Sequence, residues 1–142
     1  SIPGDLNGSA ASLNDGGDVA VLGAPNHGAG TGRVYVYTKA SGKWSAPVIV
    51  EAPVGGNFGN SVVVANAGTT FYVSESAPGA NGFYAYRTTD AGVWENFAFM
   101  SSPFQPGSTN LPLAGSQSGL IVGLTHDNDP NFAIWATGFI LE

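Results

Sequence analysis

Two segments of the chain, Gly32-Arg33-Val34-Tyr35-Val36-Tyr37 and Gly82-Phe83-Tyr84-Ala85-Tyr86, decide the fold, because they are two copies of one pattern. Each copy is followed by a Gly-x-Trp element, at Gly42-Lys43-Trp44 and at Gly92-Val93-Trp94. Each is also preceded by an apolar run that ends in Ala-Pro. Since these elements recur together and in the same order, the sequence contains an internal repeat of about 50 residues.

A third, weaker copy comprises Gly119-Leu120-Ile121-Val122-Gly123 and Phe132-Ala133-Ile134-Trp135-Ala136, without a Gly-x-Trp element. The 142 residues have the length of one domain. We therefore divide a single domain, residues 1–142, into repeat 1 at about 5–53, repeat 2 at about 54–103 and repeat 3 at about 104–142.

Each repeat is expected to form four short strands. In repeat 2 these are residues 61–65, 70–74, 82–87 and 94–100, which are rich in Val, Tyr and Phe and separated by Gly, Asn and Pro turn signals. No stretch has helical periodicity, so almost no helix is predicted. The predicted fold class is all-β, with about three four-stranded antiparallel sheets arranged as β-propeller-type blades. A β-sandwich with coincidentally similar hairpins is the alternative.

Composition excludes several classes of function. Lys and Arg number only four against 10 Asp and Glu, so the chain cannot neutralise a run of phosphates, and neither nucleic-acid binding nor docking on an anionic membrane is expected. There is no cysteine and no apolar run of the length that spans a membrane. Charged residues are 10% of the chain, and the uncharged polar surface is typical of extracellular, virion-surface or cell-surface proteins.

Repeat 2 resembles the FG-GAP repeat of integrin-α-type β-propellers in three elements: Phe58-Gly59-Asn60-Ser61-Val62, Ala77-Pro78 and the Gly82 segment. Repeat 1 matches in Gly23-Ala24-Pro25 and the Gly32 segment, but has Leu6-Asn7-Gly8-Ser9 where Phe-Gly is expected. Repeat 3 has neither motif. The resemblance implies propeller blades over about residues 5–100 and, by extension, the rest.

The number of repeats poses a problem of closure, because propellers have about four to eight blades. Three blades would leave two apolar faces uncovered. We therefore expect the sheets to be completed by homo-oligomerisation. Incorporation into a larger assembly, or a compact sandwich or prism of three sheets, is the alternative.

The resemblance also implies a candidate calcium site, since FG-GAP repeats often carry a Ca²⁺-binding loop of Asp and Asn oxygens. Asp127, Asp129 and Asn131 alternate as such a loop requires, and the segment Asn14–Asp18 is a looser match. Asp and Asn also cap turns through their own backbone. We favour the turn interpretation and expect no cofactor, with Ca²⁺ as the alternative at Asp127, Asp129 and Asn131.

No catalytic motif is present, so an enzyme is not expected: there is no Gly-x-Ser-x-Gly, and Glu51, Glu75 and Glu95 are isolated. His27 and His126 fall after the second strand of repeats 1 and 3, and are interpreted as polar loop residues that are also candidate ligand contacts.

Trp44, Trp94 and Trp135 are the main ligand-binding candidates, because an exposed indole stacks on the apolar face of a sugar. Their repetition favours packing instead, in which case Trp44 and Trp94 should occupy similar environments. Two functions follow: a non-enzymatic binding or adhesion module for glycans or a protein partner, and a structural subunit of a capsid decoration, spike or surface layer.

Overall fold

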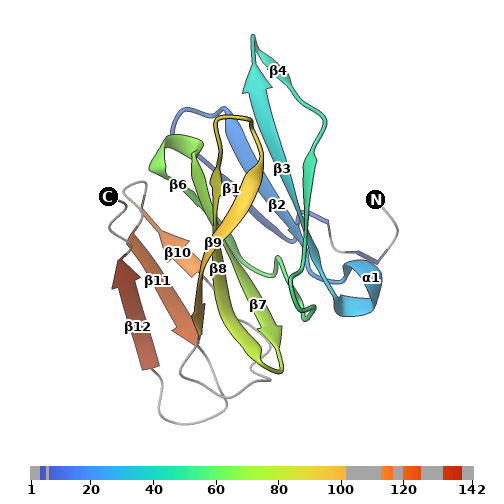
Figure 1. Cartoon of the computed structure of the whole chain (residues 1–142), viewed down its shortest axis with the longest axis vertical. Coiled ribbons are helices and arrows are strands. Elements are labelled where there is room, and N and C mark those ends of the chain that lie inside the picture. Colours follow the sequence, from blue (N-terminus) through green and yellow to red (C-terminus); the bar gives the residue numbers. More distant parts are fainter. Residues whose placement is uncertain (1–3, 6, 102–112, 117–119, 126–132, 139–142) are drawn as a thin grey trace.

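The computed structural model describes residues 4–5, 7–101, 113–116, 120–125 and 133–138, and the described part is all-β, as predicted (Figure 1). Three antiparallel sheets follow one another along the chain. Sheet 1 contains β1 (Ala10–Leu13), β2 (Val19–Ala24), β3 (Arg33–Ala40), β4 (Lys43–Trp44) and β5 (Val48–Glu51). Sheet 2 contains β6 (Val62–Ala65), β7 (Thr70–Ala77), β8 (Ala80–Thr88) and β9 (Trp94–Ser101). Sheet 3 contains β10 (Leu113–Gly115), β11 (Leu120–Thr125) and β12 (Ala133–Gly138).

Each sheet is a meander in which a strand pairs with the next along the chain. In sheet 1 the four-stranded core is β1-β2-β3-β5, and β4 makes a short hairpin with the end of β3. The four strands of sheet 2 lie where the sequence predicted them, although β7 extends to Ala77 because Ala77 pairs with Ala80 across Pro78-Gly79. The described part of repeat 3 supplies three of the expected four strands.

Helical structure is confined to two short turns among the described residues, as the absence of helical periodicity predicted. These are α1 (His27–Gly30), between β2 and β3, and η1 (Asn66–Gly68), between β6 and β7. Both contain residues with positive φ. No helix in the described ranges has the length and hydropathy needed to cross a membrane.

The first strands of the three sheets lie side by side, with β6 in contact with both β1 and β10 (Figure 1). Two hydrogen bonds of the same kind join them. The Ser12 hydroxyl accepts the Val64 N–H at 2.9 Å, and the Ser61 hydroxyl accepts the Leu113 N–H at 2.8 Å. Because an unpaired buried N–H is costly, these serines fix the first strand of one sheet against that of the next.

Two apolar cores occupy the spaces between successive sheets. The larger core joins valines of sheet 1 to Phe58 and to aromatic residues of sheet 2. The smaller core includes Tyr72 and Phe83 from the opposite face of sheet 2 and reaches Leu113 of β10. Sheet 2 is therefore buried on both faces, which is why β7 is apolar at consecutive positions rather than at alternate ones.

The segments that resemble FG-GAP meet at the junction of sheets 1 and 2. Phe58 is fully buried with its ring edge against Tyr84 and Tyr86, at 6.1 and 6.4 Å between centroids. Gly23 and Gly59 lie back to back: a Cβ on Gly23 would come within 1.8 Å of the Gly59 carbonyl oxygen. Glycine is therefore required where the two repeats approach most closely.

Candidate interaction surface

Sheet 1 has two faces of different character, because side chains alternate along each strand. Val21, Val34 and Val36 are buried in the core shared with sheet 2. The residues between them, such as Leu22 and Tyr35, therefore point to the opposite side. We call this side the outer face of sheet 1. Its members are Ala11, Leu13, Ala20, Leu22, Tyr35, Tyr37, Ile49 and, at the β3–β4 hairpin, Lys39 and Trp44.

The outer face is organised in rows that run across the strands. Ala11 pairs with Leu22, Leu22 with Tyr35, and Tyr35 with Ile49. Residues directly opposite one another on neighbouring strands share a face and lie close enough to pack. The row is therefore a continuous apolar strip across the four main strands of sheet 1.

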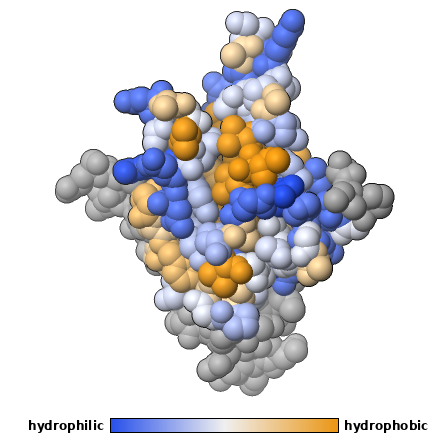
Figure 2. Space-filling model, turned by 45° about the vertical axis from the view of Figure 1, so that its right-hand side comes forward, coloured by the Kyte–Doolittle hydropathy of each residue, from blue (hydrophilic) through white to orange (hydrophobic). Residues whose placement is uncertain are grey.

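The outer face stays open in the part of the chain that the structure describes. Leu13 is 53% exposed and Ile49 is 48% exposed, whereas large apolar residues of this kind are usually buried. Figure 2 shows hydrophobic surface gathered below the hairpin of β3 and β4, with hydrophilic residues around it. Contiguous exposed apolar surface is a common mark of a binding site.

The repeat identifies the counterpart of the outer face in sheet 2. Gly8 and Gly59 donate N–H groups to the carbonyls of Gly23 and Ser74, which aligns the two repeats. Tyr35 pairs with Leu22 just as Tyr84 pairs with Val73. The outer face of sheet 1 is thus equivalent to the face of sheet 2 that carries Val64, Phe71, Val73, Tyr84 and Tyr86, which sheet 1 covers. The same repeat position is covered in one sheet and open in the other.

Trp44 and Trp94 occupy different environments, which corrects the expectation that they would be similar. Trp94 is half-buried and packs on Phe71 with ring centroids 5.0 Å apart. Trp44 is 45% exposed, and its ring is approached by the Lys39 ammonium at 5.7 Å from the centroid. The reason is that sheet 1 has Ala20 where sheet 2 has Phe71, so the indole lacks an aromatic partner. Trp44 remains available for contact with a partner.

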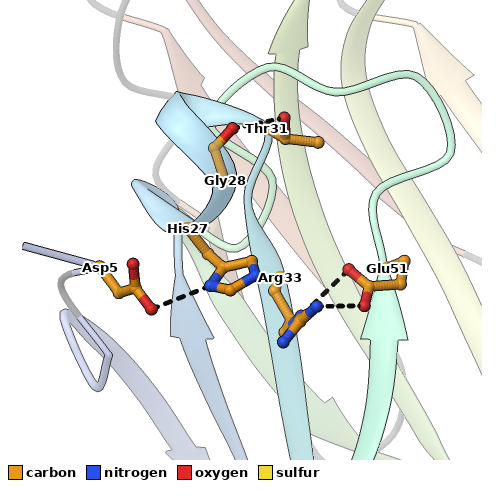
Figure 3. Close-up of polar contacts among 6 residues, drawn as sticks. All are labelled: Asp5, His27, Gly28, Thr31, Arg33 and Glu51. Atoms are coloured by element: carbon orange, nitrogen blue, oxygen red, sulfur yellow. Dashed lines mark hydrogen bonds and ion pairs between the residues drawn. The ribbon is translucent and has the colours of Figure 1, made fainter. Parts of the chain in front are cut away.

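Charged residues mark the end of the outer face opposite Trp44 (Figure 3). Arg33 begins β3 and pairs in register with Glu51, which ends β5. Two hydrogen bonds run from the guanidinium to the carboxylate, 3.0 Å from Nε and 2.5 Å from Nη2. Hydrogen bonding to Glu51 raises the pKa of Arg33. The ion pair closes this end of the apolar strip with a polar boundary.

His27 lies in α1, in the loop between β2 and β3 (Figure 3). Its Nδ1 is 2.9 Å from Oδ2 of Asp5. Asp5 is buried, so the contact ties the segment before β1 to the loop between β2 and β3. Thr31 closes the same loop by donating its hydroxyl hydrogen to the Gly28 carbonyl at 2.9 Å. The Asp5 partner carries no signal in the sequence pattern.

The segment Asn14–Asp18 forms a turn that the Asn14 side chain caps. Asn14 Oδ1 accepts the N–H groups of Asp18 and Val19 at 3.0 and 2.9 Å. Its Nδ2 donates to Asp18 Oδ1 at 2.7 Å and to the Ala67 carbonyl at 3.2 Å. The amide thereby links the β1–β2 turn to sheet 2. Within the described ranges, no three His, Asp or Glu residues come together as metal ligands would.

Glu75, which the sequence presents as an isolated carboxylate, is fully buried in β7. Its Oε1 accepts the Gly55 N–H at 2.5 Å. Burial raises the pKa of Glu75 in spite of hydrogen bonds from Gly55, Tyr84 and Val54. Burial and the nearby Glu75 raise the pKa of Tyr84 to about 12. This carboxyl group holds the linker between sheets 1 and 2 and does not face the outer face.

The remaining candidates lie outside the described residues. They are His126 and the possible calcium ligands Asp127, Asp129 and Asn131. Trp135 is placed only by its backbone, which pairs with Gly123 in β12 and β11.

Leu13, Leu22, Tyr35, Tyr37 and Ile49 were not among the predicted site residues. The signal that could have found them was the alternation of Val34 and Val36 with the two tyrosines in β3. No family model and no curated protein matches the chain.

Proposed function

We propose that the chain is a non-enzymatic binding or adhesion module that recognises a protein partner through the outer face of sheet 1. The observation that carries the proposal is the contrast between repeats: this face is open, while its counterpart in sheet 2 is buried against another sheet. A broad apolar strip without a central charge suits a protein surface better than a small polar ligand.

Two further points support a role without catalysis. At the Arg33 end of the outer face the charged side chains are paired, Arg33 with Glu51 and, in the loop before β3, His27 with Asp5. Glu75 is buried at a junction between sheets and serves the linker. The resemblance to FG-GAP repeats, the low content of charge and the placement expected on an extracellular, virion or cell surface agree with adhesion.

Because the chain has no cysteine, one introduced thiol reports on one surface position. Ile49→Cys places it on the outer face, and Val93→Cys places it on the β8–β9 hairpin, where Val93 is 54% exposed. In the native setting, on cells or particles that carry the protein, Ile49→Cys should react with a maleimide more slowly than in the dilute purified chain. Val93→Cys should react equally in both. Equal rates at both positions would contradict the proposal.

Glycan binding at Trp44 is the second candidate, favoured by the exposure of its indole at a hairpin. The Lys39 ammonium already lies over the ring, so a sugar would stack on the remaining side. Neutral oligosaccharides should then change the tryptophan fluorescence, and Trp44→Ala should remove the change while Trp94→Ala keeps it. The absence of any fluorescence response across a glycan panel would eliminate this candidate.

A further inference from the structure

We infer that the partner of the outer face is a second copy of this chain, joined face to face across a two-fold axis. The inference rests on the proposed function and names the partner of the same surface. In this arrangement the Lys39 end of one copy lies against the Glu51 end of the other.

The shape of the face favours a sheet as its occupant. Its rows of side chains cross the four main strands, with Leu22 and Tyr35 at the centre of one row. Two sheets pack face to face about 10 Å apart when both present such apolar rows. Within this chain the equivalent face of sheet 2 is covered in that way, by the valines of sheet 1. The outer face therefore has the form that this repeat uses to receive another sheet.

The distribution of charge favours a two-fold pairing of like faces. One end of the outer face carries Lys39, with Lys43 beside it in the hairpin. The opposite end carries the ion pair of Arg33 and Glu51, in which the Glu51 side chain is 59% exposed and the Arg33 side chain 22% exposed. The first end is cationic, and the second presents mainly the Glu51 carboxylate to solvent. A two-fold axis that runs across the strands brings these ends together, whereas a two-fold axis along the strands would place like charges opposite one another.

Lys39 and Glu51 of one chain are too far apart to interact with each other. Arg33 and Lys39 are at the two ends of β3, so Glu51 and Lys39 are separated by six residues of strand, about 20 Å. At that distance two exposed charges of one molecule are largely screened. Any compensation between positions 39 and 51 must therefore act between two copies.

Light scattering of the purified chain provides the first readout. The wild-type chain should give twice its mass of 14.4 kDa at micromolar concentration and dissociate on dilution. Ile49→Asp and Leu13→Asp should give 14.4 kDa, because each would place a carboxylate in the apolar contact. Val93→Asp, at an equally exposed apolar position in the turn between β8 and β9, should remain dimeric.

Charge exchange provides the second readout. Lys39→Glu and Glu51→Lys should each raise the dissociation constant of the dimer several-fold, and the double variant should recover most of the loss. Thermal melts of all variants identify any that fail to fold. Where one of the single variants fails to fold, the dissociation constant of the double variant is compared with that of the wild-type chain instead. A wild-type chain that stays at 14.4 kDa, or a dimer unaffected by Ile49→Asp, would overturn the inference.

The two proposals fail separately. A monomeric chain whose Ile49→Cys thiol is still protected in the native setting would keep the binding function and assign it to a different protein. A monomeric chain with no protection at position 49 would contradict both.

Discussion

The outer face of sheet 1 and the matching face of sheet 2 are built from the same repeat positions, yet one is open and the other buried. Leu13 and Val64 occupy equivalent places, and their exposed fractions are 53% and 2%. Tyr37 and Tyr86 are likewise equivalent, but only Tyr86 is buried. A repeated sequence pattern therefore determines which side chains share a face. It does not fix whether that face is covered.

The two faces also differ in how closely the side chains within each face pack against one another. In sheet 2 the rings of Phe71 and Tyr86 stack with centroids 4.9 Å apart, and Trp94 packs on Phe71. In sheet 1 the position of Phe71 is taken by Ala20, and the position of Phe58 by Asn7. This face of sheet 2 therefore carries the large aromatic side chains of a protein core. The matching face of sheet 1 has smaller residues, Ala20 and Asn7, at these positions.

The largest effect should come from removing the ring at the junction of the two sheets. Phe58→Ala should lower the free energy of unfolding by about 3–5 kcal/mol, because a fully buried aromatic leaves a cavity. Asn7→Ala, the matching change in repeat 1, should cost less than about 0.5 kcal/mol, since Asn7 is exposed. Urea denaturation of both variants measures this difference, and equal costs would contradict the assigned junction.

The second largest effect should come from the hydrogen bond that joins β1 to β6. Ser12→Ala removes the acceptor of the Val64 N–H and leaves a buried donor unpaired, at a cost of about 1–3 kcal/mol. Ser9→Ala, an exposed serine just before β1, is the control and should be neutral. If denaturation curves of the two variants coincide, β1 is not held to sheet 2 in this way.

The two hairpin tryptophans should differ in their contribution to stability. Trp94→Ala should cost about 1–2 kcal/mol, because its half-buried ring packs on Phe71. Trp44→Ala should change stability by less than about 0.5 kcal/mol in a dilute, monomeric sample. Melting curves decide between this asymmetry and equal environments. Similar losses for both variants would restore the expectation of a repeated packing role.

A smaller effect should appear in the dependence of stability on pH. Burial raises the pKa of Glu75 in the folded chain above its ordinary value of 4.5. Its protonated form is therefore favoured by folding, and this contribution is fully present below pH 4.5 and is lost as pH rises through the folded pKa. Over that window the wild-type unfolding free energy should fall by up to about 1.4 kcal/mol per pH unit relative to Glu75→Gln. Parallel profiles of the two proteins would show that Glu75 does not titrate differently on folding.

The sequence predicted the placement of strands well because turn residues and alternation are local signals. Pro78-Gly79 and the apolar run of β7 are examples. Exposure was predicted poorly, since it depends on what lies opposite a face. Tyr35 and Tyr84 belong to the same motif, yet one faces open surface and the other faces sheet 1.

Individual tertiary contacts were missed for a similar reason. Glu75 stands between Ser74 and Ser76 and has the pattern of a surface strand end, but the linker at Gly55 folds over it. Asp5 and His27 are 22 residues apart with no motif between them. Contacts of this kind are made by tertiary structure and leave no periodic trace.

The most direct test of the open and covered faces is the reactivity of one thiol at each of two matched positions. Leu13→Cys and Val64→Cys replace equivalent apolar residues of β1 and β6 in a chain without other cysteines. In a dilute sample, Leu13→Cys should react with a maleimide at nearly the rate of a free thiol. Val64→Cys should react many-fold more slowly, because the reagent reaches this thiol only when sheets 1 and 2 separate transiently. Comparable rates at the two positions, fast or slow, would contradict the account.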